Sequence, residues 1–232
     1  MQLQIYCQSY KKVHPYLGVD LHIPDGFLNV PTIVATSAIS AVCIGIATKQ
    51  TSKKLGEKHI PMMGIMAAFI FVAQMLNFPI IGGTSGHFLG TALAAIVIGP
   101  WAAILIMTCI LIVQCLIFQD GGLLALGANI FNMGIIGSLT GYYSFLLINK
   151  ILGSSKKSMM FAWFSAGWIS IMAAAIVCAI ELAISGIIDF NVVFTAMVGW
   201  HTLIGIGEGL ISISILSFIL ANRADLLKLE KV

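Results

Sequence analysis

Charged side chains are scarce in this 232-residue chain. Only 9% of the residues are Asp, Glu, Lys or Arg, whereas 59% are hydrophobic, and a soluble domain carries about 25% charged residues. So few charges cannot cover the surface of a water-soluble globule, which excludes a soluble enzyme. The net charge of +3 lies in loops and tails rather than in a basic groove, so no nucleic-acid partner is expected. The sequence predicts an integral membrane protein.

Several chemical motifs are also missing. The chain has no GxxxxGK[ST] phosphate loop, so it does not bind ATP by that route, and it has neither HExxH nor GxSxG. The five cysteines are scattered without a CxxC pair, as is typical of small apolar side chains in helices. We therefore expect no enzymatic activity and no organic cofactor.

Most of the charges gather in three clusters, at Lys49–Lys58, Lys150–Lys157 and Arg223–Lys231. Short basic loops stay in the cytoplasm, so an even number of membrane crossings should separate each pair of clusters. Seven apolar runs approach the length of about 20 residues that a span needs: 30–48, 61–78, 87–98, 101–118, 129–148, 159–185 and 192–221. The sequence predicts an all-α bundle of about seven transmembrane helices, with the N-terminus outside and the C-terminus inside. The run 87–98 is short, so it is either tilted or continued past Gly99–Pro100.

This topology brings three of the five histidines to the outer face. His22 lies in the segment L-H-I-P-D-G-F-L-N, His87 ends the glycine-rich loop N-F-P-I-I-G-G-T-S-G-H, and His201 lies near the outer end of the last span. Imidazole is a ligand for Zn, Cu, Ni and Co. A lone histidine is more often structural or solvated, but two outward-facing histidines in a chain with so few other ligands favour a metal site.

The segments HIPDGFL and NFPIIGGTSGHFLG, together with seven spans, resemble the CbiM/NikM family from Leu21 to about Ala221. Members are substrate-binding membrane components of energy-coupling factor (ECF) importers, a class of ABC importer, for cobalt and nickel. The resemblance implies a multi-pass subunit of the cell membrane that captures Ni²⁺ or Co²⁺ outside. It also implies three kinds of partner: a transmembrane coupling subunit, cytoplasmic ATPase subunits and a small accessory membrane subunit. Nickel is favoured, and cobalt uptake for cobalamin biosynthesis is the alternative. A stand-alone channel or secondary transporter is less favoured, because no inverted repeat is visible.

The same resemblance implies the metal ligands. They are the free amine of residue 21, the backbone nitrogen and ring of His22, and the ring of His87. Four in-plane nitrogens suit Ni²⁺ or Cu²⁺ and disfavour tetrahedral Zn²⁺. This chain departs from the pattern, because position 21 is Leu and twenty residues precede it. Residues 1–20 do not read as a secretory signal. We expect them to be a non-native or removed extension, with Met at position 21 in the native start and residues 21–232 forming one membrane domain.

Other residues are expected around the metal or at a partner. His201, Glu208, Asn77, Thr84 and Ser85 are candidates for supporting the ligands, and Glu208 shares a helix face with His201 at i+7. A buried charge in a membrane helix costs at least about 2.5–3.5 kcal/mol, so Glu181 and Glu208 should face the bundle interior, where a purely structural contact is the alternative. Small residues let helices pack closely, and the resemblance makes Ser37, Ala41 and Gly45 the candidate face for the coupling subunit.

Overall fold

The computed structural model describes residues 22–56, 59–75, 78–80, 84–153 and 155–227. Within these ranges the regular secondary structure is helical apart from one short hairpin, which confirms the predicted all-α class. The helices are α2 (Val30–Lys54), α3 (Ile60–Gln74), α4 (Thr91–Ile98), α5 (Pro100–Val113), α6 (Leu126–Asn129), α7 (Gly137–Leu152), α8 (Lys156–Ile184) and α9 (Phe190–Asn222). Two π-helical segments, η2 (Gln114–Phe118) and η3 (Ile130–Ile136), continue α5 and α6, and a 3₁₀ turn, η4 (Ala224–Leu227), follows α9. The hairpin pairs β1 (Phe78–Ile80) with β2 (Thr84–Gly86) in antiparallel register.

Five helical stretches of the described chain are long and apolar enough to cross a membrane: Val30–Lys54, Pro100–Phe118, Leu126–Leu152, Lys156–Ile184 and Phe190–Asn222. Each contains or overlaps one of the predicted runs, and the shorter α3 corresponds to a sixth. The remaining run, 87–98, is only partly helical, because residues 87–90 are not helical and α4 has eight residues. At 1.5 Å per residue α4 is about 12 Å long, too short to cross alone. The predicted break is real, since Gly99 ends α4 and precedes α5.

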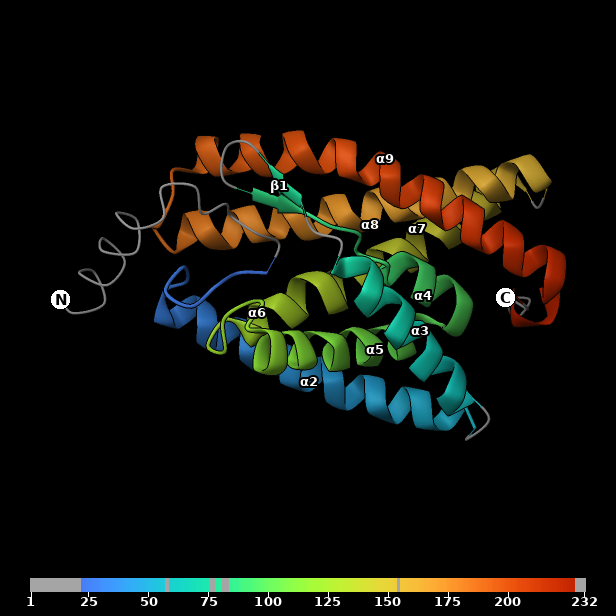
Figure 1. The fold of residues 1–232 in the computed structure, drawn as a ribbon, viewed down its shortest axis with the longest axis horizontal. Coiled ribbons are helices and arrows are strands. Elements are labelled where there is room, and N and C mark those ends of the chain that lie inside the picture. The colour runs from blue at the N-terminus through green and yellow to red at the C-terminus, as the bar shows by residue number, and fades with distance from the viewer. Residues whose placement is uncertain (1–21, 57–58, 76–77, 81–83, 154, 228–232) are drawn as a thin grey trace.

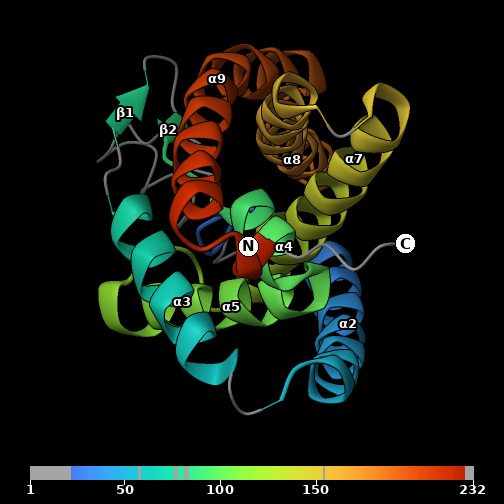
Figure 2. The same ribbon diagram turned by 90° about the vertical axis from the view of Figure 1, so that its right-hand side faces the viewer.

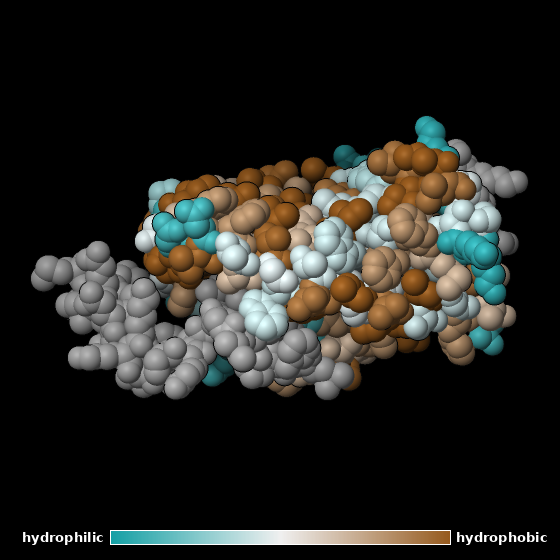
Figure 3. Space-filling model, turned by 90° about the horizontal axis from the view of Figure 1, so that it is seen from above, coloured by the Kyte–Doolittle hydropathy of each residue, from teal (hydrophilic) through white to brown (hydrophobic). Residues whose placement is uncertain are grey.

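The short helix α4 lies at the centre of the molecule. Seven of its eight residues are buried, and it packs against α5, α7, α8 and α9. Figure 2 shows α4 in the middle of a ring formed by α2, α3, α5, α7, α8 and α9. The outer surfaces of these helices carry many exposed apolar side chains, and Figure 3 shows apolar residues along the length of the bundle with hydrophilic residues toward its ends. This distribution is that of a multi-pass membrane protein.

The basic clusters meet at one end of the bundle. Figure 1 shows the C-terminal ends of α2 and α9 and the connection between α7 and α8 on the right, while the first residues of α2 and α9 lie on the left. Lys54, Lys150 and Arg223 therefore share one end, called here the basic end, as the charge pattern requires for an even number of crossings. The opposite end is called the hairpin end. Which end faces the cytoplasm stays a prediction.

Candidate functional site

The segment that carries His22 is held inside the hairpin end by polar side chains, of which Asn129 is buried and Asp25 is exposed. Asn129 makes two hydrogen bonds to the backbone of Ile23: its Oδ1 accepts from the Ile23 N–H at 2.7 Å, and its Nδ2 donates to the Ile23 carbonyl at 3.1 Å. The carboxylate of Asp25 accepts from backbone N–H groups of the loop 123–125. Irregular backbone is tolerated within a membrane protein only where such partners satisfy it. These bonds fix His22, which is 2% exposed.

The segment that carries His87 is fixed in the same way from α9. The carboxylate of Glu208 accepts from the backbone N–H of Leu89 through Oε2 and from that of Gly90 through Oε1, both at 2.8 Å. Gly90 has φ +75°, and a Cβ there would lie 2.7 Å from the ring of Phe88, so this position requires glycine. The non-helical residues 87–90 thus enter the core with His87 buried at 1% exposure.

The two histidine rings lie against each other. Their centroids are 4.9 Å apart and their planes differ by 26°. In His87, Nδ1 lies 2.9 Å from the carbonyl of Phe88 and must donate to it. In the neutral ring this leaves Nε2 without a proton, and Nε2 makes no hydrogen bond to any described residue. In His22, Nε2 lies 3.1 Å from Oε1 of Gln114, and Nδ1 makes no hydrogen bond within the described chain, although Asp120 Oδ1 is 3.5 Å away. Each ring therefore offers one nitrogen with a free lone pair.

His201 lies beside this pair. It is fully buried, its Nδ1 donates to the carbonyl of Met197 at 2.7 Å, and its Nε2 has no partner among the residues described. It is close enough to His87 for an electrostatic interaction. The structure thus places His22 against His87, with His201 in the neighbourhood of His87.

The structure describes the other residues predicted to bind the metal or to support its ligands in less detail. Thr84 and Ser85 form part of β2, which packs against α9. Leu21 and Asn77 lie outside the described residues. Among the residues that are described, no three His, Cys, Asp or Glu side chains are grouped so that they could hold a metal ion. A metal ion between His22 and His87 would therefore need further donors such as backbone nitrogen.

The two buried carboxylates have different partners. Glu181 accepts a hydrogen bond from Asn132 Nδ2 at 2.7 Å, which joins α8 to η3. Glu208 binds the backbone ahead of α4 instead of a side chain on a neighbouring helix. Glu208 therefore supports the segment of His87 directly, while Glu181 makes a contact between helices.

Sequence reasoning did not assign Gln74, Gln114 and Asn129 to the site. All three are buried amides in otherwise apolar runs, and such amides must find hydrogen-bond partners inside the protein. Gln114 begins η2 and Asn129 immediately precedes η3. π-Helical turns are frequent at functional sites, and here both occur where a helix passes the histidine pair.

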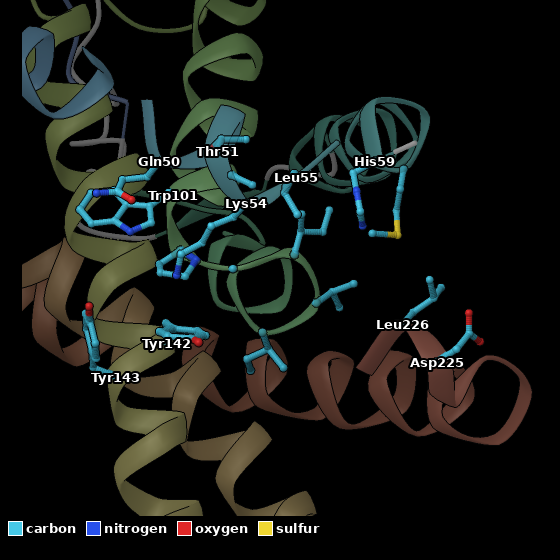
Figure 4. Close-up of a pocket in the computed structure, with 17 residues that line it drawn as sticks. Gln50, Thr51, Lys54, Leu55, His59, Trp101, Tyr142, Tyr143, Asp225 and Leu226 are labelled. Carbon is cyan, nitrogen blue, oxygen red and sulfur yellow. The ribbon is translucent and has the colours of Figure 1, made fainter. Parts of the chain in front are cut away.

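A separate cavity of about 410 Å³ opens at the basic end. Figure 4 shows Lys54 and neighbouring side chains of α2 facing it together with Tyr142 and Tyr143 of α7 and the Asp225 region after α9. None of the predicted metal-site residues lines this cavity, so it is distinct from the histidine pair.

The small-residue face on α2 is only partly open. Ser37 is half-buried and packs against Gly127, where a Cβ would overlap it. Ala41 and Gly45 are exposed, and a Cβ at Gly45 would meet nothing within 4 Å. A partner helix could therefore approach Ala41 and Gly45 directly, while Ser37 lies at the edge of this face.

The bundle and its buried histidine pair define a multi-pass membrane protein whose interior presents two ring nitrogens that make no hydrogen bond to a described residue. The chain matches the family described as "Cobalt uptake substrate-specific transmembrane region" (CbiM) over residues 22–226, and it belongs to that family. It is 42% identical over 210 residues to a candidate fused nickel transport protein, NikMN, of Archaeoglobus fulgidus, an alignment that covers 90% of this chain and 68% of that protein.

Two further matches cover nearly the full length of the other protein. The chain is 31% identical to the cobalt transport protein CbiM of Sorangium cellulosum, over 89% of this chain and 94% of that one. The crystal structure of a truncated transition metal transporter superimposes with a TM-score of 0.81 at 34% identity, covering 86% of this chain and 98% of that structure. The same arrangement of helices therefore occurs in a protein described as a metal transporter.

Proposed function

We propose that this protein is the substrate-binding membrane subunit of an ECF-type ABC importer and that it captures Ni²⁺ outside the cell. The observation that carries the proposal is the stacked pair of His22 and His87, in which each buried ring keeps one lone pair free of described partners. Such nitrogens are suitable ligands for a borderline metal ion. ATP hydrolysis belongs to separate cytoplasmic subunits, so this chain is a transport subunit and not an enzyme.

Four nitrogens complete the proposed site. The amine of residue 21 and the backbone nitrogen of His22 close a five-membered chelate ring with the metal, and that backbone nitrogen and Nδ1 of His22 close a six-membered ring. Nε2 of His87 supplies the fourth ligand. Four nitrogens in a plane favour Ni²⁺. Co²⁺ is the second candidate, because the family description names cobalt uptake.

This ligand set requires a free amine at residue 21, and we propose that residues 1–20 are absent from the working protein. Intact-mass spectrometry of the protein purified from its native membrane should give a mass that begins at residue 21, read as Met. A mass that includes residue 1, in protein that still binds one Ni²⁺ tightly, would contradict the proposed ligand set.

Metal analysis tests the histidines directly. The native protein should bind one Ni²⁺ or Co²⁺, and both His22→Ala and His87→Ala should lose most of it. His59→Ala is the matched control, because His59 lies at the basic end beside the cavity. Undiminished metal content in His87→Ala would show that the metal lies elsewhere. Competition between the two ions then decides between nickel and cobalt.

The coupling subunit is proposed to dock on α2 at Ala41 and Gly45, with Ser37 at the edge of the contact. Ala41→Trp should abolish co-purification of the coupling and ATPase subunits and leave metal binding intact. Gly207→Trp is the control, because Gly207 is also exposed with nothing within 4 Å but lies on α9. Complex formation that is equally lost in both variants would argue against a specific face on α2.

A further inference from the structure

We propose that Gln74 and Gln114 form a one-way hydrogen-bond relay that sets the ring tautomer of His22 and joins it to the segment that carries His87. The inference rests on the proposed function, because it names the residues that prepare the metal site. Neither glutamine is a proposed ligand. Both act as positioning residues, through the ring of His22 and the backbone of Leu89.

The relay runs through three hydrogen bonds between α3, η2 and the two non-helical segments that contain His22 and Leu89. Gln74 Nε2, at the end of α3, donates to the carbonyl of Leu89 at 2.8 Å. Gln114 Nε2, at the start of η2, donates to Gln74 Oε1 at 2.9 Å. Gln114 Oε1 then faces Nε2 of His22 at 3.1 Å. Both glutamines are buried, at 1% and 0% exposure, so water does not replace these partners.

The direction of the relay follows from the carbonyl at its end. A backbone carbonyl can only accept, so Gln74 must present its NH₂ to Leu89 and its oxygen to Gln114. Gln114 must then present its NH₂ to Gln74 and its oxygen to His22. An amide oxygen can only accept, so His22 carries its proton on Nε2 and keeps the lone pair on Nδ1. The carbonyl of Leu89 thus determines which nitrogen of His22 is free for metal.

The opposite tautomer has a competing partner. Asp120 Oδ1 lies 3.5 Å from Nδ1 of His22, so a His22 ring protonated on Nδ1 could turn that proton toward a carboxylate. If Gln74 no longer fixes the amide of Gln114, that amide can rotate and offer its NH₂ to Nε2. The proton then moves to Nδ1, the nitrogen that the proposed site needs bare. The relay therefore acts against a specific alternative.

The first experiment measures, in the absence of metal, which ring nitrogen of His22 carries the proton. Nitrogen-15 NMR of the native protein in detergent, with His22→Ala identifying the signal, should show His22 protonated on Nε2 and bare on Nδ1. Gln74 makes no described hydrogen bond to His22, so in Gln74→Met the signal should shift toward the Nδ1-protonated form only through Gln114. Thr108→Val is the control, because it removes a buried hydroxyl from α5 that bonds only within its own helix among the described residues, and it should leave the His22 signal unchanged.

Metal titration supplies the second reading. Gln74→Met and Gln114→Met should each weaken Ni²⁺ binding about 10-fold, in the range found for residues that orient metal ligands. The double variant should be no weaker than the single ones, because both changes break the same relay.

An Nδ1-protonated His22 in the unaltered protein overturns the relay even if neither variant folds. Unchanged ring signals in Gln74→Met, or strictly additive losses of affinity, overturn it as well. Because the NMR reading uses no metal, a failure of the relay is distinct from a failure of Ni²⁺ binding in His22→Ala and His87→Ala.

Discussion

The two ends of the bundle treat polar groups in opposite ways. At the hairpin end, Glu208, Asn129 and the two glutamines are buried and bind the backbone of non-helical segments or one another. At the basic end, the ion pair of Arg223 with Asp225 is more than half exposed on both sides. A buried polar group costs free energy unless its partner is in place, whereas an exposed ion pair contributes little. Geometry is therefore enforced at the hairpin end and left adaptable at the basic end.

The largest effect that separates the two ends is expected for Glu208→Ala. This change leaves the buried N–H groups of Leu89 and Gly90 without acceptors, and each such loss costs about 1–3 kcal/mol. The segment of His87 should loosen, and Ni²⁺ affinity should fall about 10- to 100-fold. Isothermal titration and a thermal melt measure the two consequences.

Glu208→Gln is the informative companion to that change. Its amide oxygen keeps one acceptor but turns an NH₂ toward the other backbone N–H, so it should lie between the native protein and Glu208→Ala. If Glu208→Ala bound Ni²⁺ with native affinity, the hydrogen bonds from Leu89 and Gly90 to Glu208 would not be needed for metal binding.

A smaller effect is expected for Gly90→Ala. Placing an L-residue in the left-handed conformation costs about 1–2 kcal/mol, and the new Cβ would lie 2.7 Å from Phe88 and 2.9 Å from Ile70. The thermal midpoint should fall, and metal affinity should weaken less than in Glu208→Ala, because both hydrogen bonds to the carboxylate can still form. Gly207→Ala on the exposed face of α9 controls for an added methyl group and should leave the thermal midpoint unchanged or higher. A Gly90→Ala protein as stable as the native one would contradict the tight fit at this position.

The long helices were predictable because their signal is local. Uninterrupted apolar runs between charged clusters correspond to α2, α8 and α9 to within a few residues at most ends, and a helix in lipid satisfies its own backbone. The turn signal Gly99–Pro100 likewise marks a real boundary. What the runs could not show is that residues 87–90 are held in a non-helical conformation, since this depends on Glu208, more than a hundred positions later in the chain.

The site was predictable only in part, for the same reason. His22 and His87 stand out because histidine is rare here and lies next to glycine and proline motifs. The hydrogen-bond partners of Gln74 and Gln114 lie 15 to 92 positions away. An amide in an apolar run predicts that a hydrogen-bond partner exists inside the protein, but it does not identify that partner. The two π-helical turns, which change the register at Gln114 and after Asn129, have no comparable local signal in the sequence.

The smallest effect is expected at the basic end, for Arg223→Gln. The guanidinium donates two hydrogen bonds of 2.9 Å to Asp225, a geometry that would be important in a buried site. Here the side chains are 63% and 52% exposed, so water replaces each partner and salt screens the attraction. The thermal midpoint and Ni²⁺ affinity of Arg223→Gln should equal those of the native protein. This equality should hold at low and at high salt. A loss of metal affinity comparable to that of Glu208→Ala would show that the basic end is coupled to the histidine pair. The two ends would then differ in the exposure of their polar groups but not in their importance for metal binding.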